Sequence, residues 1–135
     1  MSLETCKDIL KYCEFLNVKT VHLFGGEPLL NFTPLMDAIG DFAFSHPEVE
    51  ILMTTNGTLF NQTILSFLEQ LPYFTLNFTY LNRSDVNNTN SLINIINNTN
   101  INYFITTVIN KDNIKYIIDS LRGLPERKTQ EYINL

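Results

Sequence analysis

The 135-residue chain has no tryptophan, only two cysteines, five glycines and five prolines, and charged residues make up 17% of it. Two cysteines are too few for a disulfide framework or for a metal centre built from thiolates alone. No apolar run approaches the roughly 20 residues that a membrane span needs, so we expect no membrane partner. The nine Lys and Arg residues are scattered and the net charge is −5, which argues against a nucleic-acid partner. The first residues do not form a secretory signal, so we expect a cytoplasmic protein.

What is present is typical of a globular protein: 44% of the residues are hydrophobic. The length predicts a single domain over residues 1–135. Residues 3–16 have the apolar spacing of an amphipathic helix, and Cys6 and Cys13 lie two turns apart on its apolar face. Two turns span about 11 Å, which a disulfide does not bridge, so we expect buried, reduced thiols. The same face is expected to carry Leu3, Ile9, Leu10 and Leu16.

Strands alternate with helices along the rest of the sequence. The predicted strands are residues 20–24, 49–55, 74–81 and 101–109, and they begin roughly 25–29 residues apart. Helices are expected from a Thr33 cap to Pro47, from Asn61 or Thr63 to Pro72, over residues 92–96, and from 110 to 124. Residues 82–91 are polar and predict a loop, and the tail from 126 predicts either a frayed helix or the start of a further element.

This spacing predicts an α/β fold that forms part of a (β/α) barrel, with about four parallel strands. A complete barrel allots about 31 residues to each strand–helix unit, so four units make about half of one. A four-stranded parallel sheet cannot close on itself. We therefore expect its open face to be covered by the tail, by a second copy in a homodimer, or by further strands.

One turn combines features of a ligand site. The strand at residues 20–24 ends in Phe24-Gly25-Gly26-Glu27-Pro28. Paired glycines allow a positive φ and a close approach of the backbone to a ligand. In parallel α/β folds, ligands bind at the carboxyl ends of the strands, where this turn falls. His22, within the apolar strand, is expected to be a buried histidine with its hydrogen bonds satisfied.

Three segments together resemble one family. The Gly-Gly-Glu-Pro turn is followed about thirty residues later by Thr54-Thr55-Asn56-Gly57, each after a strand, and residues 107–114 provide a third match. The combination resembles radical S-adenosylmethionine (radical SAM) enzymes over about residues 4–124, corresponding to their second to fifth strand–helix units. The resemblance implies a parent that reductively cleaves S-adenosylmethionine on a four-iron four-sulfur cluster and abstracts hydrogen with the 5′-deoxyadenosyl radical.

The resemblance also implies cofactor-binding positions. The backbone of the glycine turn would meet the methionyl amine of S-adenosylmethionine, the following strand end would line the pocket, a residue of the third strand would approach the ribose, and the fourth strand would lie beside the adenine. On this chain, these positions are Gly25, Gly26, Glu27, Pro28, Thr54, Thr55, Asn56, Asn77 and Val108, with Ile109 beside Val108. The substrate, a small molecule or a peptide, is not identified.

The chain departs from the family at the cluster. The family binds it with Cys-x3-Cys-x2-Cys, whereas Cys6 and Cys13 have the wrong spacing and lie on a predicted helix. We therefore expect neither cluster nor S-adenosylmethionine on this chain alone, no catalytic residue and no activity; the cluster loop and the later strands are expected outside it. The alternative is a cysteine-less relative that acts as a binding or accessory protein.

Three further alternatives concern the turns themselves. Glu27 can simply cap its turn, and Asn56-Gly57 can be an ordinary left-handed turn after a strand. Phe24-Gly25-Gly26-Glu27 also resembles the turn of nucleotide cyclases, but Pro28 and the helix that follows do not fit that hairpin.

Overall fold

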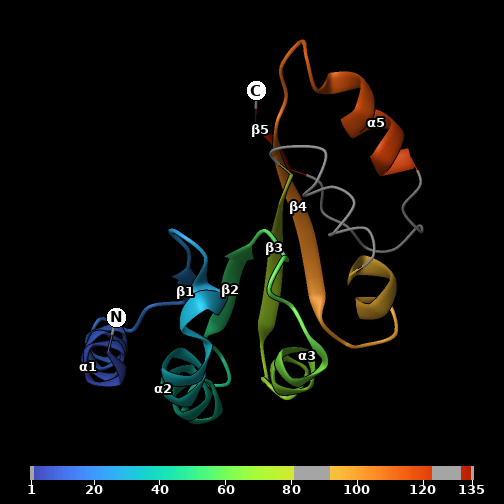
Figure 1. Cartoon of the computed structure of the whole chain (residues 1–135). Coiled ribbons are helices and arrows are strands. Elements are labelled where there is room, and N and C mark those ends of the chain that lie inside the picture. Colours follow the sequence, from blue (N-terminus) through green and yellow to red (C-terminus); the bar gives the residue numbers. More distant parts are fainter. Residues whose placement is uncertain (1, 81–91, 123–131, 135) are drawn as a thin grey trace.

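The computed structural model describes residues 2–80, 92–122 and 132–134 (Figure 1). The elements, in chain order, are α1 (Leu3–Phe15), β1 (Thr20–Leu23), a 3-10 helix η1 (Pro28–Asn31), α2 (Phe32–Ser45), β2 (Glu50–Thr55), α3 (Gln62–Leu68), β3 (Phe74–Tyr80), β4 (Asn102–Val108), α5 (Ile114–Arg122) and β5 (Tyr132–Asn134). A helical turn also covers residues 92–96, as predicted. The predicted loop at 82–91 lies outside the described residues.

The strands form one sheet in the order β1-β2-β3-β4-β5, and all of its neighbouring pairs are parallel. This confirms the predicted α/β class and the four strands that alternate with helices. The short β5 is a fifth strand, which pairs Thr106–Val108 with residues 132–134. The expectation of a frayed helix in the tail is therefore wrong for these residues.

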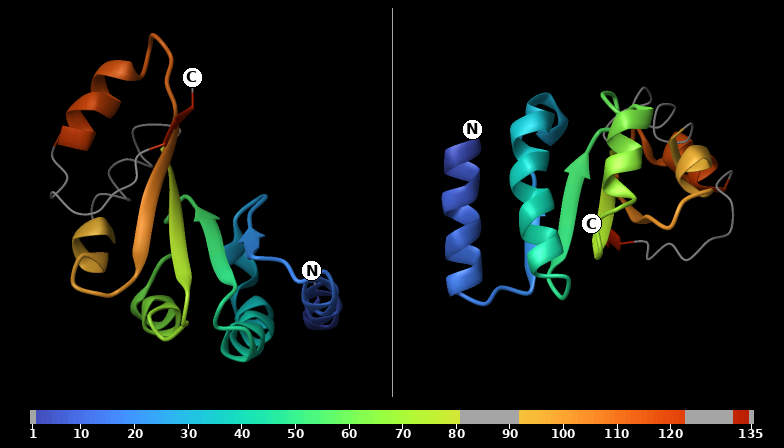
Figure 2. Two further views of the ribbon diagram at one scale, coloured as in Figure 1. Left: turned by 180° about the vertical axis from the view of Figure 1, so that it is seen from behind. Right: turned by 90° about the horizontal axis from the view of Figure 1, so that it is seen from below.

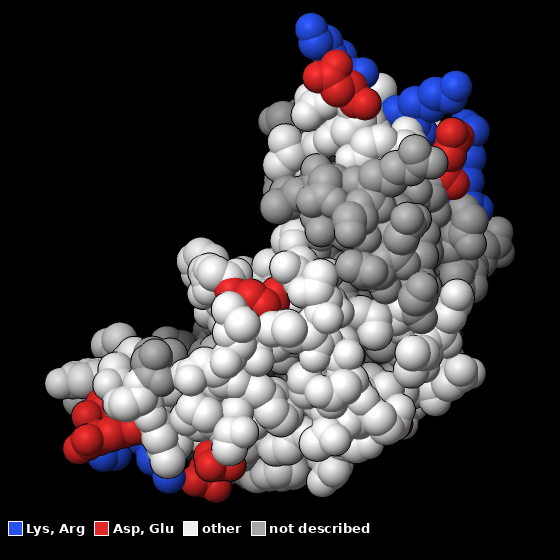
Figure 3. Space-filling view, viewed as in Figure 1, with Lys and Arg blue, Asp and Glu red and all other residues white. Residues whose placement is uncertain are grey.

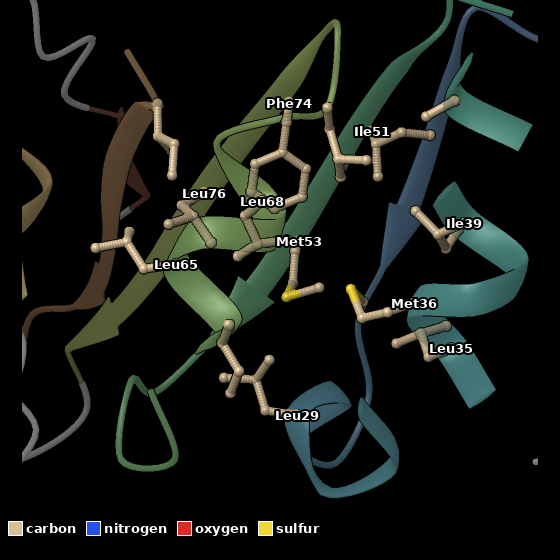
Figure 4. Packing of buried hydrophobic residues seen from close by; sticks show 14 of the residues in the cluster. Leu29, Leu35, Met36, Ile39, Ile51, Met53, Leu65, Leu68, Phe74 and Leu76 are labelled. Atoms are coloured by element: carbon tan, nitrogen blue, oxygen red, sulfur yellow. The ribbon is translucent and has the colours of Figure 1, made fainter. Parts of the chain in front are cut away.

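The helices lie on one side of a curved sheet, and the opposite, concave face carries no helix among the described elements (Figures 1 and 2). Successive side chains of a strand point to opposite faces, so each strand contributes one set to each side. The helix side is apolar: Ile51, Met53, Leu76 and Phe78 are completely buried. Figure 4 shows Met53 of β2 between α3 and α2, where its sulfur points toward that of Met36.

Two helix starts differ from the prediction: α2 continues directly from η1, and a side chain of the turn before α5 binds the backbone. α2 begins at Phe32 after η1, and Thr33 lies inside it and does not cap it. α5 begins at Ile114, since the Asn110 side chain accepts hydrogen bonds from the backbone N–H groups of Asp112 and Asn113 (2.9 and 3.0 Å). The predicted end of this helix, at 123–125, lies outside the described residues.

α1 is more exposed than its pattern predicts. Cys6 and Leu10 are buried, and Cys13 is half-buried; both cysteines are free thiols. Ile9 and Leu16, expected on the same face, are 48% and 68% exposed, so this part of the prediction is wrong. The helix packs mainly on α2, and one neighbour covers only a narrow stripe of its surface.

In the view of Figure 3, charged side chains gather near α1 and around α5, and the described surface between them is mostly uncharged apart from an acidic group. Across the described ranges, no helix combines the length and the hydrophobicity that crossing a membrane requires.

Candidate cofactor site at the carboxyl edge of the sheet

The candidate site consists of two turns that follow neighbouring parallel strands. Gly25 and Gly26, after β1, have φ angles of +91° and +58°. A Cβ built on either glycine would meet no heavy atom within 4 Å. The backbone conformation therefore requires glycine at both positions, while the space beside them is open, as expected for a turn that a ligand approaches closely.

Glu27 joins the two turns. One carboxylate oxygen, Oε1, accepts hydrogen bonds from the Thr55 hydroxyl (2.7 Å) and from the backbone N–H of Leu29 (3.2 Å). The other, Oε2, accepts from the backbone N–H of Asn56 (3.0 Å). Glu27 is also the N-cap of η1. The capping alternative is thus observed, with the addition that the same carboxylate fixes the turn after β2.

The turn after β2 is held from within as well. The Thr55 hydroxyl accepts from the N–H of Gly57 (3.0 Å), and the side-chain oxygen Oδ1 of Asn56 accepts from both the N–H and the hydroxyl of Thr58 (2.9 and 2.7 Å). Gly57 has a φ of +77°, and a Cβ there would lie 2.7 Å from Leu92 Cδ1. The turn after β2 therefore has one left-handed residue, Gly57, and is stabilised by the hydroxyl of Thr55, which is 1% exposed.

A cleft of about 210 Å³ adjoins the glycine turn. It is lined by Leu23, Phe24, Gly25, Glu27, Pro28, Asn31 and Leu35. Three of the sequence-predicted site residues, Gly25, Glu27 and Pro28, thus border one hollow at the end of β1.

Thr54 and Asn77 belong to a second group, on the concave face. The Asn77 amide donates to the Thr54 hydroxyl (3.0 Å) and accepts from the Thr106 hydroxyl (2.8 Å), and Thr54 also bonds to His22 Nε2 (2.7 Å). We call these four residues the polar row. Asn77 is 7% exposed, whereas His22 is exposed and its ring lies 4.8 Å from that of Phe24. The prediction of a buried His22 is therefore wrong, although the side chain does have a partner.

Sequence reasoning missed Thr106. Its signal was available, because Thr106 shares the alternation phase of Phe104 and Val108 in a strand whose opposite phase is buried. Val108, predicted beside the adenine, is 60% exposed at the end of β4, and Ile109 is half-buried. Both side chains are aliphatic, so they take no part in the hydrogen bonds that connect the two turns and the polar row.

The residues of the site suit S-adenosylmethionine better than they suit an iron–sulfur cluster. The open space beside Gly25 and Gly26 suits a ligand that binds the backbone. The two cysteines of the chain lie on α1, and no group of three or more potential metal ligands occurs in the part of the chain that the structure describes. The two cysteines of the chain therefore do not fit an iron–sulfur cluster, which needs more thiolates than they supply.

The strands and helices form part of an α/β barrel, and the two turns lie at the carboxyl ends of its neighbouring strands β1 and β2. The chain is 30% identical over 125 residues to 7-carboxy-7-deazaguanine synthase of Clostridium acetobutylicum, across 91% of this chain and 49% of that protein. This relative is a radical SAM enzyme, which confirms the resemblance seen in the sequence. No protein-family model matches the chain.

Solved structures of SuiB from Streptococcus suis, also a radical SAM enzyme, share the fold. The TM-score is 0.70 at 18% identity for SuiB, over 100% of this chain and 34% of that one. It is 0.68 at 17% identity for SuiB bound to S-adenosylmethionine, over 98% and 34% of the two chains. The chain thus spans about half of its curated relative and about a third of SuiB, consistent with a fragment of a radical SAM protein.

Proposed function

We propose that this chain forms the S-adenosylmethionine-binding half of a radical SAM enzyme. The observation that carries the proposal is the pair of left-handed glycines beside an open cleft, joined through Glu27 to the neighbouring turn. Gly25 and Gly26 would offer backbone groups to the methionyl end of the cofactor, and Thr54 and Asn77 would offer polar groups from the concave face. When bound to a reduced cluster, the cofactor supplies a 5′-deoxyadenosyl radical for hydrogen abstraction.

The residues of this chain bind and orient the cofactor in this account, and they do not perform the chemistry. The thiolates for the cluster must come from sequence outside these 135 residues, because Cys6 and Cys13 lie on α1. The isolated chain is accordingly expected to be inactive. The substrate of the whole protein, a small molecule or a peptide, belongs to the same proposal, since both the curated relative and SuiB are much longer than this chain.

The second candidate is a cysteine-less relative that binds a partner without catalysis. The observation that favours it is that both cysteines lie on the helix α1 and neither belongs to the two turns. Sequencing the source gene on the 5′ side of the codon for Glu4 distinguishes between the two proposed functions. We expect Cys-x3-Cys-x2-Cys within about forty codons of it; a reading frame that starts here, or continues upstream without these cysteines, supports the binding protein.

Self-association of the isolated chain is a further expectation. The concave face carries apolar Leu52 and Phe104, both half-buried, beside the polar row, and Val108 is 60% exposed at its edge. An open parallel sheet that presents such residues to water favours pairing with a second copy. Light scattering at micromolar concentration should give the mass of a dimer, and a strictly monomeric mass would contradict this expectation.

A further inference from the structure

The polar row connects four strands through three successive hydrogen bonds. It runs from Thr106 on β4 through Asn77 on β3 and Thr54 on β2 to His22 on β1. The bonds are 2.8, 3.0 and 2.7 Å long, all within the normal range. Each member therefore constrains the hydrogen positions of the next.

Two directions keep the hydrogen of Thr54 within the row, so that this hydroxyl both donates and accepts there. A threonine hydroxyl has one hydrogen, a neutral imidazole has one N–H and one acceptor nitrogen, and an amide can turn over to exchange its oxygen and nitrogen. In one direction, Thr106 donates to Asn77 Oδ1, Asn77 Nδ2 donates to Thr54, and Thr54 donates to His22 Nε2. In the other, His22 Nε2–H donates to Thr54, Thr54 donates to Asn77 Oδ1, and Asn77 Nδ2 donates to Thr106.

The structure has the amide of the first direction, with Nδ2 toward Thr54 and Oδ1 toward Thr106. Thr54 accepts from Asn77 in this direction, and its single hydrogen stays within the row by donation to His22 Nε2. The neutral imidazole then carries its hydrogen on Nδ1, the tautomer less favoured by free histidine in water.

We propose that His22 is a positioning residue whose tautomer sets the orientation of the Asn77 amide through Thr54. A ligand atom that accepts a hydrogen bond from His22 Nδ1 stabilises the observed amide orientation. A ligand atom that donates to Nδ1 requires Nε2–H, which leaves the Thr54 hydrogen without an acceptor in the row and so favours the reversed amide. His22 is exposed on the concave face, whereas Asn77 is 7% exposed, so a group bound at the accessible end of the row selects the hydrogen-bonding pattern at its buried middle.

This inference rests on the proposed function only in giving Asn77 a ligand contact; the coupling within the row does not depend on it. If Asn77 contacts S-adenosylmethionine, then a substrate hydrogen-bonded to His22 influences which groups the cofactor pocket presents. The polar row would thus link substrate recognition to cofactor orientation.

The test measures the tautomer of His22 by long-range proton–nitrogen NMR on the full chain, at a pH where the imidazole is neutral. The wild type is expected to have Nδ1–H. In Asn77→Asp the carboxylate can only accept, so Thr54 must donate to it and His22 Nε2–H must donate to Thr54. We expect this variant to invert the tautomer ratio at a side chain that Asn77 does not touch directly.

A buried carboxylate can impair folding, so two further variants accompany Asn77→Asp. Thr54→Val removes the hydrogen-bond partner of His22 Nε2, so His22 should adopt the Nε2–H tautomer that free histidine prefers. Thr106→Val removes the donor to Asn77 Oδ1, so both orientations of the amide and both tautomers of His22 should be populated. Thr54→Ser keeps the hydroxyl and should preserve Nδ1–H, as should Thr79→Val, on the same face of β3 outside the row. Nε2–H in the wild type, or a tautomer unchanged by Thr54→Val and Thr106→Val, would overturn the inference. Because no cofactor is present, failure here is distinguishable from failure of the proposed function.

Discussion

Replacing Glu27 with alanine is expected to destabilise the chain by roughly 2–4 kcal/mol, because hydrogen bonds to a charged acceptor contribute about 1.5–3 kcal/mol and three donors lose their partner. Those donors are the Thr55 hydroxyl and the backbone N–H groups of Asn56 and Leu29. Urea unfolding followed by far-UV circular dichroism measures the change, since the chain has no tryptophan.

The exposed Glu48 provides a matched control, because Glu48→Ala removes the same charge away from both turns and should change stability by less than about 0.5 kcal/mol. Glu27→Gln should fall between the two variants: it keeps one oxygen acceptor but places an amide NH₂ where one carboxylate oxygen was. Hydrogen exchange at Asn56 and Leu29 should accelerate in Glu27→Ala. Equal stability of Glu27→Ala and Glu48→Ala would show that Glu27 does not brace the two turns.

Replacing Phe78 with alanine is expected to cost about 3–5 kcal/mol, the usual range for a fully buried phenylalanine. Phe78 is completely buried, and its ring lies 6.3 Å from that of Tyr103 and 6.4 Å from that of Phe60. It also borders Gly57, since a Cβ on that glycine would lie 3.5 Å from Phe78 Cε1. The cavity would therefore loosen the turn after β2 as well as the core.

Phe15→Ala is the control for this variant, because Phe15 is 84% exposed and the truncation leaves no cavity. Both unfolding midpoints are measured in urea under the same conditions. A midpoint for Phe78→Ala that coincides with that for Phe15→Ala would mean that the helix-side face of β3 is not the centre of the core.

The sequence predicts the strands well for a physical reason. Strands buried on the helix side carry an apolar residue at every second position, as Ile51 and Met53 do in β2. The 3.6-residue period locates the helices similarly, but it does not report how many neighbours a helix has. Ile9 and Leu16 follow the period of α1 and are nevertheless exposed, because that helix packs mainly on α2.

The sequence predicts the two turns of the candidate site, but it does not predict the hydrogen bonds that link residues of different strands. Paired glycines after a strand indicate positive φ, and Asn-Gly indicates a left-handed turn, as the structure shows for Gly25, Gly26 and Gly57. That Glu27 spans to Thr55 depends on strand order, since the two residues are 28 positions apart. The polar row depends on register: Thr54 opposite Asn77 is a property of the sheet and not of either strand alone.

The most direct test of the central claim is to assay the complete gene product for 5′-deoxyadenosine after anaerobic purification, iron–sulfur reconstitution and incubation with S-adenosylmethionine and a strong reductant. The account predicts 5′-deoxyadenosine and about four irons per protein, as one four-iron cluster requires. Gly26→Val should lower the affinity for S-adenosylmethionine while the iron content is unchanged. A complete gene product that folds but neither holds the cluster nor forms 5′-deoxyadenosine would contradict the proposal and favour the non-catalytic binding protein.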